Sequence, residues 1–239
     1  MNPARRAAEF AARACDEFSP TPASNREAPQ ANSEEDHPVD ERTAIEPGLF
    51  GDAATLLERA TCYVLGAAAA VTTARLANAT PCTGWDLRML VAHVNDSLAV
   101  VADTLVSRVP DDGEDSADPV ETLRNRARVL LETCLAHPDD VHVGGLPLDG
   151  RIAAATGALE IAVHGWDIAR ACGRDSPIPD GLATALVRLA PMVVTEATRP
   201  FLFRPPVAWS RQAAPGERLV AYLGRNPVAG PGGGLTPRG

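Results

Sequence analysis

Long segments with apolar residues at helical spacing dominate this chain and restrict what it can fold into. We expect helices at about residues 52–78, 87–108, 118–136, 151–172 and 180–198, with a last short helix at 216–224. No run alternates apolar and polar side chains as a half-buried strand would, although the loop 138–150 has room for a short extended piece. Four or five long helices with short connections predict an all-α bundle.

Several residues mark where these helices begin and end. Asp86 is the expected N-cap of the segment 87–108, because its carboxylate can accept the unpaired N–H groups of the first turn. Gly173 is the expected C-terminal glycine of the segment 151–172. Pro191 lies inside the segment 180–198, and we expect it to kink or shorten that helix.

The two ends of the chain differ in composition from the middle. Residues 1–17 could form a short Ala-rich helix, whereas residues 19–48 are rich in Pro, Ser and acidic residues with almost no apolar ones. We therefore expect residues 1–48 to be a mostly disordered acidic tail. The ending "VAGPGGGLTPRG" (228–239) reads as a short flexible extension. The sequence therefore predicts one folded domain over residues 50–227.

Composition and charge exclude several classes of protein. The formal net charge is −9, and no basic stripe with interleaved aromatic residues is present, so a nucleic-acid partner is not expected. The longest uncharged apolar run, between Arg59 and Arg75, is too short and too rich in Ala to span a bilayer. The five cysteines are scattered without a CxxC spacing, which favours reduced thiols. We expect a cytoplasmic protein that does not enter a membrane.

Three polar residues in the stretch "ALEIAVHGWDIARA" (158–171) share one helix face. Glu160 and His164 are one turn apart, which lets a carboxylate oxygen and an imidazole nitrogen meet on one cation such as Zn²⁺. Small residues accompany them on this face, Gly157 among them, which would leave room for a ligand. The alternative is an ordinary salt bridge between positions i and i+4, worth a few tenths of a kcal/mol.

A metal site of this kind needs a third ligand, and His93 is the best candidate. It lies off the apolar stripe of the segment 87–108, where it could face a neighbouring helix at the edge of the bundle. It could equally be half-exposed and inert. Two His and one Glu with an open fourth position match the ligand set of catalytic rather than structural zinc sites.

Neighbouring residues allow both a functional and a structural interpretation. Asp167 could orient a metal ligand from outside the ligand set, or be a plain helix-surface or loop-bonding carboxylate. Trp85 and Trp166 are expected near the site, with an ordinary core role favoured for both. Cys82 precedes a helix N-terminus, which stabilises thiolates, but no base pairs with it in the sequence. We therefore favour a buried structural role for Cys82.

Three segments together resemble a known family. They are "TPCTGWDLRMLVAHV" (80–94), "LEIAVHGWDIARACGR" (159–174) and "RPPVAWSRQAAPGERLVAYLGRNP" (204–227). They are similar to the metal-binding domain of mycothiol-dependent maleylpyruvate isomerases, and more closely to a subgroup of largely uncharacterised single-domain relatives. These proteins belong to the DinB/YfiT-like superfamily of four-helix bundles. The resemblance covers roughly residues 50–227.

The resemblance implies a DinB-like four-helix bundle that holds a divalent metal, with zinc the expected ion. The implied ligands are His93, Glu160 and His164, with water or substrate at the open position. The isomerases carry a further C-terminal domain that contributes to catalysis, and we expect this chain to end before one.

Three hypotheses for function follow. The first is a metal-dependent enzyme that activates a low-molecular-weight thiol such as mycothiol for transfer or isomerisation. The second is a non-enzymatic metal-binding or protein-interaction module. The third, ranked last, is a metal-free bundle in which Glu160 and His164 form only a salt bridge. Whether the chain is a monomer or a homodimer stays open.

Overall fold

A computed structural model describes residues 53–106, 116–134, 141–143, 146–148, 150–196, 199 and 203–228. The elements in chain order are helix α2 (Ala53–Ala68), the 3₁₀ turn η1 (Thr73–Arg75), α3 (Leu87–Val106), α4 (Pro119–Cys134), strands β1 (Val141–Val143) and β2 (Leu146–Leu148), α5 (Gly150–Ala171), α6 (Asp180–Val193) and α8 (Pro215–Tyr222). The predicted tail 1–48 lies outside the described residues, and so does the predicted tail 228–239 except for Val228.

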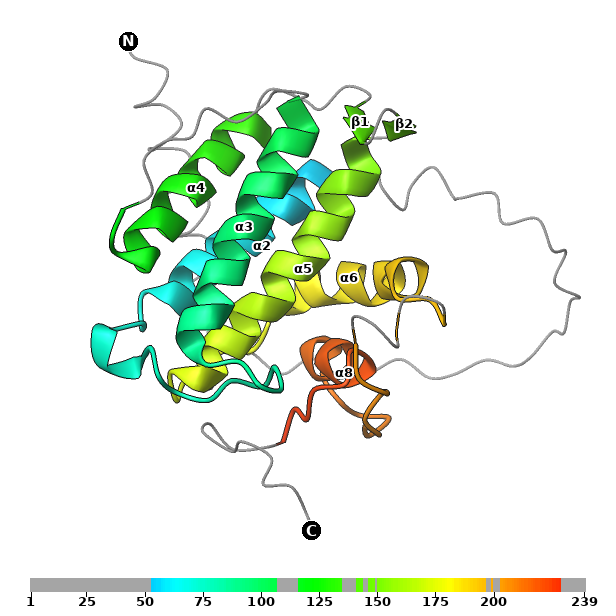
Figure 1. Cartoon of the computed structure of the whole chain (residues 1–239). Coiled ribbons are helices and arrows are strands. Elements are labelled where there is room, and N and C mark those ends of the chain that lie inside the picture. Colours follow the sequence, from blue (N-terminus) through cyan, green and yellow to red (C-terminus); the bar gives the residue numbers. More distant parts are fainter. Residues whose placement is uncertain are drawn as a thin grey trace, which may run out of the picture.

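Helices α2, α3, α4 and α5 form a four-helix bundle. α2 and α3 each pack against both α4 and α5, so the four helices surround one shared core (Figure 1). The predicted all-α fold is confirmed. Within the described residues, no helix is both long and apolar enough to cross a membrane.

The predicted apolar stripe of α3 faces this core. Leu87, Leu90, Val91, Val94 and Leu98 are fully buried. These residues recur at spacings of three and four, as the buried face of a helix requires. His93 lies off this stripe, so its side chain leaves the core and is available at the edge of the bundle.

α5 is the central helix, and two of its glycines allow close helix packing. A Cβ on Gly165 would lie 3.0 Å from ring atoms of Tyr63 in α2, and one on Gly157 would lie 2.8 Å from Val101 in α3. The room that the sequence indicated beside Gly157 is therefore filled by a side chain of α3. The small residues on this part of α5 serve helix contact.

The first helix is shorter than expected, and the predicted range of 52–78 was wrong. α2 ends at Ala68, and Arg75 Nη1 donates to the carbonyl oxygen of Ala70 just beyond that end. The next residues include the β-branched "VTT" (71–73), which lowers helix propensity. The chain then passes through η1 and turns back onto α3, where Arg88 N–H donates to Leu76 O.

The other predicted helix ends are close to those observed. Met89 N–H donates to Asp86 Oδ1 at 2.8 Å, so Asp86 is the N-cap of α3. α5 ends at Ala171, and Gly173 just beyond it has φ +74°, with Arg174 N–H bonded to Ala169 O in the pattern of a Schellman turn. Pro191 stands in the last turn of α6, which ends at Val193 rather than at 198.

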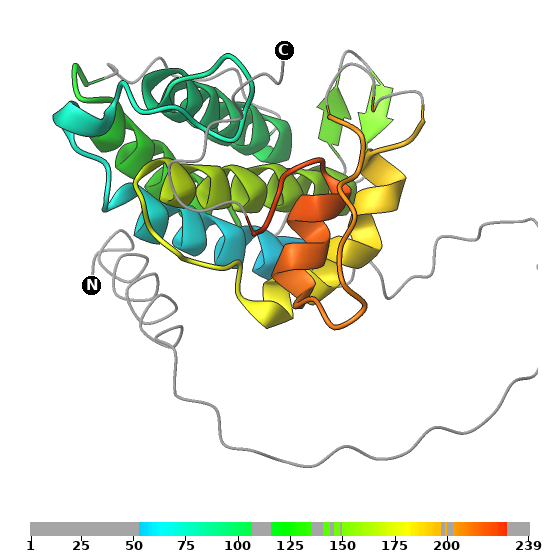
Figure 2. The same cartoon turned by 90° about the horizontal axis from the view of Figure 1, so that it is seen from below.

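The remaining elements cover one end of the bundle. β1 and β2 form a small antiparallel hairpin before α5, which is the extended piece that the loop 138–150 had room for. α6 packs against α5, and α8 packs against α6 (Figure 2). The segment 203–228 thereby returns to the C-terminal half of α5, where the candidate site lies.

Candidate metal centre

The loop between η1 and α3 is shaped by its own hydrogen bonds. Thr80 Oγ1 accepts the N–H of Cys82 at 3.1 Å and donates to Trp85 O at 2.9 Å. Gly84 has φ +80°, a conformation that glycine adopts without strain. This tight turn explains the T-P-C-x-G-W spacing, because it brings Cys82 and Trp85 to the side of α5 that carries His164.

His93, Glu160 and His164 converge between α3 and α5. The Oε1 atom of Glu160 lies 2.8 Å from His93 Nε2 and 3.1 Å from His164 Nε2. The side chains of His93 and Glu160 are 37% and 33% exposed, whereas that of His164 is 9% exposed. The three predicted residues are thus brought together, with one side of the cluster open to solvent.

The charges of this cluster are strongly coupled. Burial by itself would raise the pKa of Glu160, but hydrogen bonds from His164 and His93 outweigh it and hold the pKa below its ordinary value. Burial opposes the charged form of His164, yet hydrogen bonds to Asp167, Cys82 and Glu160 raise its pKa well above the ordinary value. Without a metal, His164 is an imidazolium held between two carboxylates.

Asp167 lies behind His164 and is completely buried. Its Oδ2 atom accepts the Nδ1–H of His164 at 3.0 Å and an N–H of Arg225 Nη2 at 2.8 Å. Burial would raise the pKa of Asp167, but the charge of Arg225 and the bond from His164 lower it to about 2. Its burial excludes a helix-surface role for Asp167, whereas its bonds to Arg225, in the segment after α8, are those of the loop-bonding alternative.

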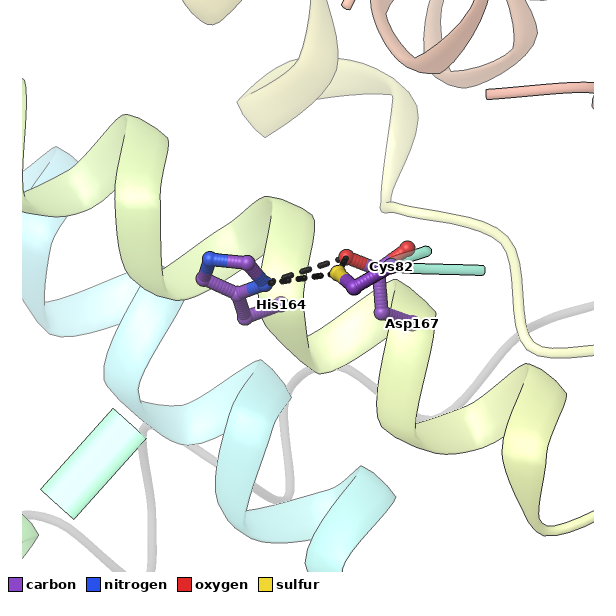
Figure 3. Close-up of side chains that lie close together, drawn as sticks. All are labelled: Cys82, His164 and Asp167. Atoms are coloured by element: carbon purple, nitrogen blue, oxygen red, sulfur yellow. Dashed lines mark hydrogen bonds and ion pairs between the residues drawn. The ribbon is translucent and has the colours of Figure 1, made fainter. Parts of the chain in front are cut away.

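Cys82 belongs to the same cluster. Its Sγ atom lies 3.3 Å from Asp167 Oδ2 and 3.9 Å from His164 Nδ1 (Figure 3). Arg225 Nη2 approaches the same sulfur to 3.8 Å. The thiol is half-buried rather than buried. The expectation of a cysteine without a basic neighbour was wrong, because the neighbours come from α5 and from the C-terminal segment, far away in the sequence.

The two tryptophans have different roles. The ring of Trp85 meets that of His93 edge-on at 4.9 Å between centroids and stacks on that of His164 at 6.5 Å. Trp85 is therefore a wall of the site, and it also packs, partly buried, against the hydrophobic core as favoured for it. Trp166 is buried in the core as expected, with Arg170 over its ring.

Two overlapping groups of side chains could hold a metal ion. One is His93, Glu160 and His164, and the other is Cys82, His164 and Asp167; in each, the ligand atoms lie within 4.8 Å of one another. Imidazole nitrogen and carboxylate oxygen suit zinc, and the first group is open to solvent, as a site with a free position requires. In the second group Arg225 already places a positive charge beside Asp167, which opposes a further cation.

Fold and site together define the class: an all-α helical bundle with a histidine and carboxylate centre between two of its helices. Residues 57–169 match the family model of the mycothiol maleylpyruvate isomerase N-terminal domain, the family that the sequence resembles. No curated protein matches the chain, and no solved structure does.

Arg225 is the residue at the site that sequence reasoning did not identify. It follows Gly224 in "LGRNP" and lies beyond the family match, 58 positions from Asp167. Nothing in the local pattern distinguishes it from the other 21 basic residues, all of them Arg. Its only signal is the resemblance of the segment 204–227, which assigned it no role.

Proposed function

We propose that this protein binds a divalent metal, with zinc the expected ion, through His93, Glu160 and His164. The observation that supports this is the convergence of both Nε2 atoms on the same carboxylate oxygen, at 2.8 and 3.1 Å. An imidazole pair with one carboxylate is a ligand set of catalytic zinc sites. Asp167 would accept the Nδ1–H of His164 and so hold the ring in the orientation in which Nε2 can bind the metal.

We propose further that the bundle is an enzyme that activates a low-molecular-weight thiol for transfer or isomerisation. The name of the matched family supports mycothiol as the thiol. A bound zinc ion would lower the pKa of a coordinating thiol and so favour its reactive thiolate form. The residues of this chain would provide an open side at His93 and Glu160, and an aromatic wall at Trp85.

A cytoplasmic location is part of the same proposal. None of the four cysteines that the structure describes forms a disulfide, which fits a reducing compartment. Neither a nucleic-acid partner nor a membrane is expected.

The first experiment measures metal binding. Purified protein is analysed for bound metal, and zinc affinity is compared between the wild type and the variants His93→Ala and His164→Ala. Metal in the wild type and a large loss of affinity in both variants are expected. The metal site would be refuted if the purified protein held no metal and if neither variant changed its weak zinc affinity. The pair Glu160 and His164 would then form only a salt bridge.

The second experiment separates an enzyme from a metal-binding module without catalysis. Co²⁺ is substituted at the site and mycothiol is added, and a new sulfur-to-metal absorption band is expected when the thiol coordinates. An unchanged spectrum, with a metal that only raises the thermal stability, would favour the non-enzymatic module.

A further inference from the structure

We infer that Arg225 is a positioning residue of the metal centre, which acts through Asp167 on the orientation of His164. The inference rests on the proposed metal-binding function and extends it to the C-terminal segment. This segment lies outside residues 57–169, which match the family.

Arg225 and Asp167 form a two-pronged contact in the interior. Arg225 Nη2 donates to Asp167 Oδ2 at 2.8 Å, and Nε donates to Oδ1 at 3.4 Å. The side chain of Arg225 is 10% exposed and that of Asp167 is not exposed at all. The remaining nitrogen, Nη1, donates to Leu223 O at 3.1 Å. Every guanidinium nitrogen thus has a protein partner, so this arginine is built into the site rather than free for a substrate anion.

The contact determines how the imidazole is held. A fully buried carboxylate stays ionised only if its charge is compensated, and Arg225 brings a positive charge into contact with Asp167 that does not depend on the protonation of His164. Ionised Asp167 accepts the Nδ1–H of His164 at 3.0 Å. This bond fixes the plane of the ring and directs Nε2 toward Glu160, where the metal would bind.

The turn after α8 places Arg225 against α5. Gly224 has φ +83°, and a Cβ there would lie 2.7 Å from Cβ of Arg204 and 2.8 Å from its carbonyl oxygen. Arg225 N–H then donates to Val220 O at 2.9 Å. The backbone at this turn therefore has little freedom, which makes the guanidinium a rigid anchor for Asp167.

Arg170 offers a matched control. Its Nη2 donates to Pro227 O at 2.8 Å, so it too connects α5 to the C-terminal segment, two residues beyond Arg225. It does not contact Asp167 in the structure. If metal affinity fell only because the C-terminal segment docked more weakly, changing either arginine would lower it.

The test measures Co²⁺ affinity from its visible absorption for the wild type, Arg225→Gln, Arg225→Lys, Asp167→Asn, the double variant Asp167→Asn/Arg225→Gln and Arg170→Gln, with circular dichroism as the check of folding. Arg225→Gln should bind Co²⁺ about tenfold more weakly, as loss of an outer partner of a ligand does. Lysine keeps the charge and should restore most of the affinity. In the Asp167→Asn background, Arg225→Gln should add little further loss, because the two residues act as a unit. Arg170→Gln should bind as the wild type does.

Three results would overturn the inference while the proposed function survives: unchanged binding by Arg225→Gln, an equal loss in Arg170→Gln, or losses that multiply in the double variant. A folded wild type that binds no Co²⁺ would instead refute the proposed function, and the inference with it. If Arg225→Gln does not fold, the double-variant comparison is made with Arg225→Lys instead. The small loss of Co²⁺ affinity caused by Arg225→Lys must then disappear in the Asp167→Asn background.

Discussion

His93 and Glu160 are 67 positions apart in the sequence, yet His93 Nε2 lies 2.8 Å from Glu160 Oε1 and joins α3 to α5. The same oxygen also contacts Nε2 of His164 at 3.1 Å. Because a carboxylate oxygen accepts, each Nε2 atom carries a proton in these contacts. A metal ion at this point would replace both protons.

Glu160→Gln should abolish tight zinc binding. An amide is a poor zinc ligand, and loss of a direct ligand should exceed the 10–100-fold cost of losing an outer partner, so we expect more than about 100-fold. Zinc affinity is measured by competition with a chelator. Glu132→Gln is the matched control, since Glu132 pairs with the exposed Arg128 on α4, away from the cluster, and its substitution should have no effect. Wild-type affinity in Glu160→Gln would show that the cluster is not the binding site.

Zinc affinity should rise with pH. Burial opposes protonation of His164, but its bonds to Asp167, Cys82 and Glu160 raise its pKa, so the ion competes with a proton there at neutral pH and above. Affinity should therefore keep rising as the pH increases above the ordinary His pKa of 6.5, with proton release on binding. Calorimetry in two buffers of different ionisation enthalpy measures that release. Binding that is independent of pH and of buffer would contradict the arrangement.

The free energy of unfolding at acid pH should depend on Asp167. Its pKa is lowered to about 2 by Arg225 and His164, against 3.8 for an ordinary Asp. A lowered pKa stabilises the fold above the unfolded value and loses that contribution as the pH falls through the folded value, here about 2 to 3 kcal/mol between pH 4 and pH 2. Urea unfolding of the metal-free protein should show the advantage of wild type over Asp167→Asn shrinking as the pH falls from about 4 to about 2. A constant difference would argue against an ionised, paired Asp167.

Much of the fold could be predicted from sequence because its signals are local. The stripe of α3, the cap at Asp86 and the glycine at 173 each depend on residues within a turn or two. The end of α2 was misplaced because alanines and apolar residues continue past Ala68 with no glycine or proline to stop the helix. There the contact of Arg75 with Ala70 and the packing of the loop on α3 decided the outcome.

The site was predictable only in part for the same reason. The pair Glu160 and His164 follows from helix geometry, and His93 followed from its place off the apolar stripe of α3. The surroundings of Cys82 and the role of Arg225 depend on tertiary packing of a loop and of the C-terminal segment. No periodicity in the sequence encodes those contacts.

Cys82→Ser should leave the metal ligands unchanged. Cys82 Sγ lies 3.3 Å from Asp167, in the group of side chains where the positive charge of Arg225 opposes a metal ion. We therefore expect no sulfur-to-metal absorption band in the Co²⁺ protein before a thiol is added. The spectrum of Cys82→Ser should match that of the wild type, with affinity within about threefold, well below the cost of losing an outer partner. A band in the wild type that the variant lacks would place the ion at Cys82, His164 and Asp167 instead.

Gly165→Ala should loosen the contact between α2 and α5 beside the site. The new Cβ would lie 3.0 Å from the ring of Tyr63 and 3.3 Å from Cα of Val64, and Tyr63 is held by its bond to Ser176 O at 2.7 Å. Overpacking of this kind costs about 1–3 kcal/mol. Denaturant unfolding measures the change in the free energy of unfolding.

The control for this substitution is Gly66→Ala, at a helical position in α2 where a Cβ meets nothing within 4 Å. That variant should gain about 0.5–1 kcal/mol, because alanine is the better helix former and no neighbour must move. Since Gly165 adjoins His164, its variant should also bind zinc more weakly, whereas Gly66→Ala should bind it as the wild type does. If both alanine variants were more stable than the wild type, α2 and α5 would not approach each other closely at Gly165. The packing of α2 against α5 would then not set the position of His164.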